Sequence, residues 1–206
     1  ELVNINFNKC LKIILLIIAP LSLFISLEAD NFWTVFYGRN ETGSSIIRFT
    51  IIVTIFDCLY MVLNSLLQSL NRKQIIYKSV ITGLIINLFL DVPFMYLFGK
   101  LGLKAYYGAI LATFTGFVVS NIMSLLYLKK NMQITFSDTL KALPRAVVSY
   151  GILILLCIVF NKVLGIPDTR IKSIIYIIIS GVIAGGIYLV LNLKELKTIL
   201  PEKLIK

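Results

Sequence analysis

The chain has 206 residues, of which 58% are hydrophobic and only 15% charged, and its mean hydropathy is +0.92. Soluble domains carry about 45–50% apolar and about 25% charged residues, so the composition excludes an ordinary soluble globular protein. The formal net charge of +10 lies mainly between the long apolar runs, where membrane topology and contact with anionic lipid headgroups account for it without nucleic acid.

Six apolar segments are each long enough to cross the ~30 Å hydrocarbon core of a bilayer as an α-helix. The sequence therefore predicts an all-α, polytopic membrane protein with six transmembrane helices. Of the 20 Lys and Arg residues, 13 lie on the side that holds both chain ends and 7 on the other, so the positive-inside rule places both termini in the cytoplasm. The six predicted spans cover residues 13–36, 46–70, 76–98, 105–128, 143–164 and 173–193.

The first predicted span contains Pro20, which we expect to kink the helix. Its far end carries two acidic residues, Glu28 and Asp30. At a rise of about 1.5 Å per residue, these carboxylates reach the outer interface of the membrane. We therefore assign them to an outer gate or mouth rather than to the middle of the bilayer.

The second predicted span begins near Arg48, which we also assign to the outer mouth and which could pair with Glu28, Asp30 or Asp91. One face of this span is polar, because steps of four and three residues follow the helical turn of ~3.6 residues. Hydrocarbon cannot satisfy such a stripe, so it is expected to face other helices or water. The stripe runs through Thr50, Thr54, Asp57, Met61, Asn64, Gln68 and Asn71.

The third predicted span repeats polar or small residues every four positions, at Gly83, Asn87 and Asp91. Pro93 follows and removes one helical hydrogen bond, a disruption that is tolerated in a membrane where the backbone lines a cavity. We expect this face to lie against the polar stripe of the second span.

Two interpretations of the polar faces are open. Hydrogen bonds between helices, at ~0.6–2 kcal/mol each, would account for Asn64 and Gln68. A carboxylate at the bilayer centre costs at least about 2.5–3.5 kcal/mol, so Asp57 and Asp91 fit better in a wet cavity that binds a cation, a proton or a polar substrate. We predict a substrate or ion cavity lined by Asp57, Asn64, Gln68, Asn87 and Asp91.

Small residues recur every four positions in the fourth and sixth spans, a pattern that lets two helices approach closely. We interpret both ridges as packing features. The first ridge comprises Gly108, Ala112, Gly116, Ser120 and Ser124, and the second Gly181 and Gly185.

The loop before the fifth span contains "TFSD" (135–138), which is typical of a helix start and is followed by apolar residues at helical spacing. We expect a short amphipathic helix on the inner leaflet, with Pro144 in the first turn of the fifth span. The predicted organisation is a four-helix part of a transporter lobe at 1–130, then an amphipathic linker and two peripheral transmembrane helices at 131–206.

Motifs of catalysis are absent from the sequence. The chain has no histidine, no phosphate-binding loop and no paired carboxylate motif, and Cys10, Cys58 and Cys157 have no metal-ligand spacing. We therefore expect no enzyme, no cofactor and no metal. Transport would draw on an ion gradient, the membrane potential or substrate flux.

Three successive segments carry a family resemblance: "LLQSLNRK", "GLIINLFLDVPFMYLFG" and "GLKAYYGAILAT", all within residues 63–130. With "IAPLSLFISLEADNFWTVFYG" upstream, their order resembles the C-terminal lobe of polysaccharide flippases of the MOP exporter superfamily. That group includes Wzx-type oligosaccharide flippases and the MurJ and SpoVB-like lipid II flippases. The likeness covers about residues 10–130, and residues 131–206 match by hydropathy alone.

The resemblance implies half of a two-lobed, MATE-like transporter of the bacterial cytoplasmic (inner) membrane, with this chain as helices nine to fourteen. It implies flipping of undecaprenyl-linked oligosaccharide or a lipid-linked cell-wall precursor by alternating access. The expected partners are that lipid-linked sugar, membrane lipids and a missing N-terminal lobe. This chain departs from the family pattern, because Asp57 and Asp91 are acidic where basic residues usually hold the headgroup. Alternatives are a cation-coupled multidrug exporter of the MATE type and a non-transporting scaffold of a polysaccharide assembly complex.

Overall fold

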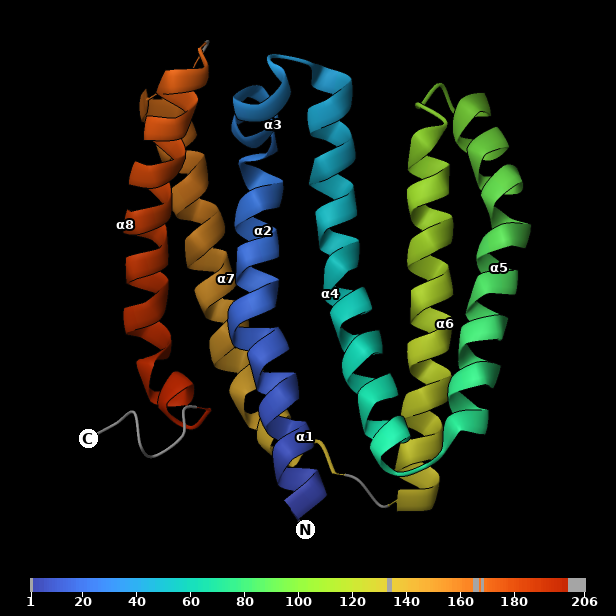
Figure 1. Cartoon of the computed structure of the whole chain (residues 1–206). Helices are drawn as coiled ribbons and strands as arrows, with labels where there is room; N and C mark the ends of the chain where they lie inside the picture. The colour runs from blue at the N-terminus through green and yellow to red at the C-terminus, as the bar shows by residue number, and fades with distance from the viewer. Residues whose placement is uncertain (1, 133–134, 165–166, 168, 200–206) are drawn as a thin grey trace. The chain divides into compact units, whose positions relative to one another are not determined.

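The computed structural model describes residues 2–132, 135–164, 167 and 169–199, and in these ranges the chain is helical apart from short turns (Figure 1). The described residues contain no strand, in agreement with the predicted all-α class. The elements are α1 Leu2–Ile13, the π-helix Ile14–Ile18, α2 Ala19–Leu27, α3 Ala29–Tyr37, α4 Glu41–Ser69, α5 Lys73–Lys100, α6 Tyr106–Met132, α7 Ser137–Leu164 and α8 Arg170–Lys197.

Six helices of the described chain are long and apolar enough to cross a membrane, which confirms the predicted polytopic architecture. They cover Val3–Leu27, Glu41–Ser69, Lys73–Lys100, Tyr106–Asn131, Ser137–Val163 and Arg170–Lys197. The first span was predicted about ten residues too late along the chain, because polar side chains near the N-terminus lower its hydropathy. Those side chains are satisfied: Asn4 Nδ2 donates to Thr135 Oγ1, and Asn8 Nδ2 donates to the Thr135 carbonyl, each at 2.8 Å.

The first span is interrupted just before Pro20 by the five-residue π-helix, in which the Ala19 N–H bonds the Ile14 carbonyl. A proline has no N–H to offer to the preceding turn, so the carbonyls of Leu15 and Leu16 need other donors. Tyr150 Oη of α7 donates to Leu15, and Tyr188 Oη of α8 donates to Leu16 at 3.1 Å. Two tyrosine hydroxyls thereby supply the hydrogen bonds that the interrupted helix cannot make itself.

By its contacts the chain divides into two compact units, Glu1–Leu11 with Val53–Phe136 and Lys12–Ile52 with Ser137–Lys206. This division differs from the break expected after residue 130, which stays a prediction about transporter lobes. We call the two units unit 1 and unit 2 and describe each by itself.

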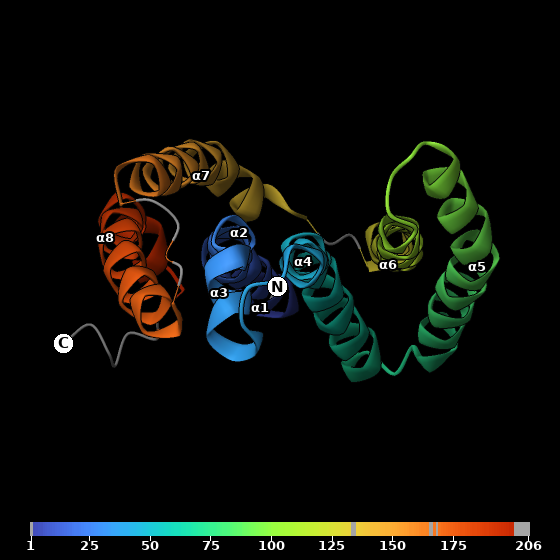
Figure 2. The same ribbon diagram turned by 90° about the horizontal axis from the view of Figure 1, so that it is seen from above.

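In unit 1, α5 and α6 lie side by side (Figure 2) and touch through the small-residue ridge. A Cβ on Gly83 would lie 2.7 Å from the Gly116 carbonyl oxygen, and one on Gly116 would lie 2.8 Å from that of Gly83. Ser120 Oγ donates to the Ser79 carbonyl at 2.9 Å. The predicted packing role of the ridge in the fourth span is therefore confirmed.

The α4 helix joins α6 in unit 1 through aromatic and aliphatic contacts. Phe56 meets Phe114 edge-on with ring centroids 4.7 Å apart, and Asn121 Nδ2 donates to the Phe56 carbonyl at 2.9 Å. Towards the α4 C-terminus a fully buried cluster follows. It comprises Phe7, Leu63, Leu67 and Leu128.

In unit 2, α7 packs against α2 and α8, and α8 also packs against α3. The assignment of the last two spans as peripheral transmembrane helices stays a prediction, although both spans pack on other helices of unit 2. The buried face of α8 carries no Asp, Glu, Lys or Arg, so a search for charged side chains overlooks it. The buried positions of α8 are Ser173, Tyr176, Ser180, Ala184, Tyr188 and Asn192.

The predicted ridge in the sixth span was also wrong at Gly185, where an added Cβ would meet nothing within 4 Å. Gly181 meets only the Phe24 ring, at 3.4 Å. The face that packs is instead the neighbouring one, through Ser180 and Ala184, which are 0% and 1% exposed. A glycine spacing marks a possible close approach, but hydroxyl and methyl side chains serve the same purpose.

Among the described residues before the fifth span there is no separate amphipathic helix, because α7 runs without a break from Ser137 and holds Pro144 inside it rather than in its first turn. Buried Ala142 and Ala146 lie on either side of the proline and continue the face that holds buried Leu153. This common packing face keeps the helix in one piece despite the hydrogen bond that the proline cannot make.

We predict that Gly83→Ala lowers the free energy of unfolding by about 1–3 kcal/mol, the usual cost of overpacking, because the new methyl group would strike the α6 backbone. Gly99→Ala in the same helix is the matched control, since a Cβ there meets nothing within 4 Å. Denaturant or thermal unfolding in a fixed detergent measures both variants. Equal stability of the two would contradict the close crossing of α5 and α6.

Candidate functional site

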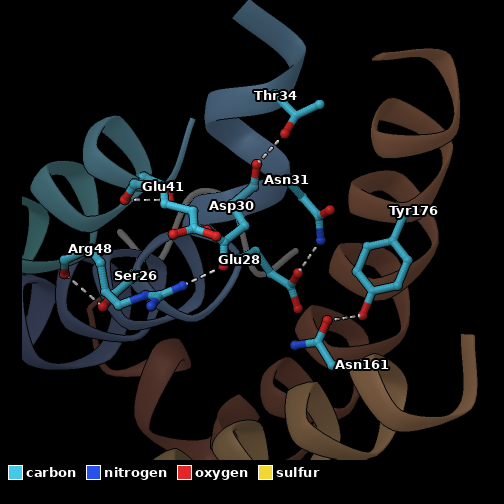
Figure 3. A network of polar contacts seen from close by, with 10 residues as sticks. Ser26, Glu28, Asp30, Asn31, Thr34, Glu41, Arg48, Asn161 and Tyr176 are labelled. Atoms are coloured by element: carbon cyan, nitrogen blue, oxygen red, sulfur yellow. Dashed lines mark hydrogen bonds and ion pairs between the residues drawn. The ribbon is translucent and has the colours of Figure 1, made fainter. Parts of the chain in front are cut away.

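The residues assigned to the outer mouth come together in unit 2, around the ends of α2, α3 and α4 (Figure 3). Arg48 Nη2 lies 2.5 Å from Asp30 Oδ2, and the two side chains are 38% and 41% exposed. Ser26 Oγ donates to the Arg48 carbonyl at 2.7 Å and ties α4 to α2. Of the pairings left open by the sequence, Arg48 therefore forms the one with Asp30.

Asp30 and Arg48 line a cavity of about 310 Å³ between α3 and the first turns of α4. Asn40 begins α4 as its cap, with Oδ1 accepting hydrogen bonds from the N–H groups of Thr42 at 2.9 Å and Gly43 at 3.2 Å. The lining of the cavity therefore contains hydrogen-bond donors and acceptors, with two acidic and two basic side chains among them. Its lining residues are Asp30, Thr34, Arg39, Asn40, Glu41, Ser44, Ser45, Arg48 and Pro167.

Glu28 takes a different place from the other two mouth residues. It lies at the turn between α2 and α3, with φ −96° and ψ 18°, and it is 1% exposed. Asn31 Nδ2 donates to Glu28 Oε2 at 2.7 Å. Burial raises the pKa of the Glu28 carboxyl above its usual value, the Asn31 hydrogen bond lowers it, and the Asp30 charge raises it further. Glu28 is not among the residues that line the cavity.

Of the five residues predicted to line a mid-membrane cavity, a pocket in unit 1 contains only Asn87. Asn87 lines a pocket of about 150 Å³ in unit 1, together with Tyr60 of α4 and Thr113 of α6. Its lining does not include Asp57, Asn64, Gln68 or Asp91. Those four residues keep their place in the predicted cavity as a prediction only.

The face of α5 that carries Asn87 was expected to lie against the polar stripe of the second span. It packs instead on α6, where an added Cβ on Gly116 would lie 3.1 Å from Asn87 Cβ. The close approach of the Gly83 and Gly116 backbones decides the partner, because glycine removes the side chains that would otherwise separate the helices. Asp57 and Asp91 are partly exposed and form no hydrogen bond or ion pair within the described ranges.

Sequence reasoning missed the polar residues that follow the mouth in the chain. Asn40, Glu41 and Ser44 all line the 310 Å³ cavity. The signal was present in "GRNETGSS", since an asparagine followed by an acidic residue and small polar residues is typical of a helix start. A helix start next to Arg39 would have placed these side chains at the outer end of the second span.

A double-mutant cycle with Asp30→Asn and Arg48→Gln should give a coupling free energy below about 1 kcal/mol that shrinks as salt is added, because partly exposed ion pairs are screened. Unfolding in detergent at low and high salt measures it. The Lys141–Asp138 pair, at 3.8 Å and with side chains 80% and 56% exposed, is the control and should show no coupling. A salt-independent coupling of several kcal/mol would contradict the partly exposed geometry.

Comparison with known proteins gives one informative match. Over 197 residues, or 92% of this chain, the sequence is 27% identical to the lipid II flippase MurJ of Bacillus subtilis (strain 168). The chain spans 35% of that relative's length. No protein-family model and no solved structure matches the chain. The match extends over the segments that carried the resemblance and over the six apolar helices. It does not separate the Wzx-type from the MurJ-type branch, and it supports a relationship to the flippases of the MOP exporter superfamily.

Proposed function

We propose that this chain is the C-terminal portion of a flippase that carries a lipid-linked cell-envelope precursor from the inner to the outer leaflet by alternating access. The observation that carries the proposal is the similarity to a lipid II flippase along 92% of the chain. The substrate is an undecaprenyl-linked oligosaccharide or a related cell-wall precursor. The membrane is the bacterial cytoplasmic membrane, with both ends of the chain on its cytoplasmic side, as the distribution of Lys and Arg indicates.

The broken first span supports a transport role. Non-helical or widened backbone at membrane depth is tolerated where protein groups or a cavity satisfy it, and transporters use such interrupted helices. Here the π-helix and Pro20 are satisfied by Tyr150 and Tyr188 of neighbouring helices.

In this proposal the polar residues of the spans line the path of the substrate or its coupling ion, and the outer mouth holds Glu28, Asp30 and Arg48. Asp57 and Asp91 form no hydrogen bond or ion pair within the described ranges, which leaves their carboxylates available to water, a cation or sugar hydroxyls. The basic groups that would hold an anionic headgroup belong to a partner lobe, since this chain spans 35% of its relative's length. The path comprises Asp57, Asn64, Gln68, Asn87 and Asp91.

The same two acids favour the second candidate, a cation-coupled multidrug exporter of the MATE type, because carboxylates inside spans commonly serve ion pathways. A non-transporting scaffold of a polysaccharide assembly complex is the third candidate, and it would need neither acid. The three candidates differ in what Asp57→Asn and Asp91→Asn should do.

We predict that each substitution in the full-length protein slows translocation of lipid-linked sugar by roughly tenfold or more, a loss of about 1.4 kcal/mol of transition-state stabilisation. Translocation is followed in proteoliposomes, with drug efflux measured in parallel. Asp138→Asn, in the exposed first turn of α7, is the control and should leave both rates unchanged. Lost efflux with intact sugar flipping would favour the exporter, and two unaffected rates would favour the scaffold.

Residues 1–206 alone, reconstituted in liposomes, should not move lipid-linked sugar, because alternating access requires a second lobe that moves against this one. The matched control is the full-length protein at equal protein-to-lipid ratio. Translocation by the fragment itself would contradict the two-lobe proposal.

A further inference from the structure

The turn between α2 and α3 buries two polar side chains, and one oxygen atom of each has no hydrogen-bond partner. Glu28 is 1% and Asn31 is 2% exposed. Asn31 Nδ2 donates to Glu28 Oε2, while Glu28 Oε1 and Asn31 Oδ1 have no hydrogen-bond partner and no solvent contact. Both orphaned atoms are acceptors in adjoining side chains (Figure 3). What the turn lacks is a donor or a cation, since buried polar groups are normally satisfied.

The ionisable groups around Glu28 do not supply that donor. Arg48 of α4 is engaged by Asp30, 2.5 Å away, and Asp30 itself is a like charge. Cys157 of α7 and Tyr176 of α8 are the other titratable groups that interact with Glu28. The Tyr176 hydroxyl already donates to Asn161 Oδ1 at 2.7 Å. A charged Glu28 would therefore be a buried carboxylate without a counter-charge, which is strongly unfavourable.

We propose that Glu28 is a proton-binding site, in which one proton on its carboxyl group keeps the α2–α3 turn seated against α7 and α8. The protonated group keeps an oxygen that accepts from Asn31 and gains an O–H that donates. A neutral acid also avoids burying a charge between helices. This inference goes beyond the transport proposal, because it holds whatever the protein carries.

The direction of the pKa shift agrees with this geometry, since burial raises the pKa of Glu28 above its usual value. The folded protein then binds a proton that the unfolded chain releases at a lower pH. The stabilisation is complete below the unfolded pKa, and it is lost as the pH rises through the raised folded pKa. A monovalent cation on the same oxygens is the competing occupant, and the test below separates the two.

The test is infrared spectroscopy of the whole protein in lipid nanodiscs, in sodium-free buffer at neutral pH. The spectrum of the natural protein minus that of Glu28→Gln should contain the carbonyl stretch of a protonated carboxylic acid. Glu41→Gln, at an exposed residue at the start of α4, is the control and should remove only carboxylate bands. A Glu28 signal consisting of carboxylate bands, or an acid band that disappears when sodium is added, would overturn the proposal.

One further measurement keeps the test decisive if Glu28→Gln folds poorly, and a second applies if that variant folds well. In the natural protein alone, the acid band should persist well above the ordinary carboxyl pKa of about 4.3, and it should shift when the protein is transferred to heavy water. The stability of the natural protein in detergent should fall as the pH rises above the ordinary carboxyl pKa of about 4.3, whereas in Glu28→Gln this fall should be absent. Parallel pH profiles of the two proteins, or stability that rises with pH only in the natural one, would contradict the proposal.

Discussion

Unit 2 depends on the hydrogen bonds that two tyrosines make to the broken first span. Pro20 has no backbone N–H, and the π-helix before it leaves the carbonyls of Leu15 and Leu16 without a backbone donor. The hydroxyls of Tyr150 and Tyr188 donate hydrogen bonds to these two carbonyls. In a bilayer each unsatisfied backbone group costs several kcal/mol, because no water replaces the missing partner. The proline therefore obliges α7 and α8 to remain next to α2, and their hydroxyls fix where along α2 they pack.

In unit 1, too, side chains of one helix donate hydrogen bonds to backbone carbonyls of its neighbours. Asn121 donates to the Phe56 carbonyl and links α6 to α4, and Ser120 donates to the Ser79 carbonyl and links α6 to α5. Lipid tails are as apolar as leucine, so apolar burial alone does not drive these helices together. Polar contacts and close packing between small residues take over that role, which makes α6 the central helix of the unit.

The six spans were predictable because apolar length is set by the thickness of the bilayer, and the α6 ridge because glycine spacing permits close contact. The bounds of the first span were not predictable, since Asn4 and Asn8 are polar in the sequence and satisfied only by Thr135 of a distant segment. In the candidate site, the Arg48–Asp30 pair was one of several that the sequence allowed. The burial of Glu28 depends on where the chain turns after α2, which no periodicity reveals.

The contact between Gly83 and Gly116 also limits how unit 1 can move. Sliding α5 along α6 by one helical turn would bring the side chain of Asn87 to the place where Gly83 now meets the α6 backbone. There is no room for that side chain, so a one-turn ratchet between these helices is sterically blocked. The two helices must rotate or tilt as a single rod, and any change of shape within unit 1 has to occur at the ends of that rod.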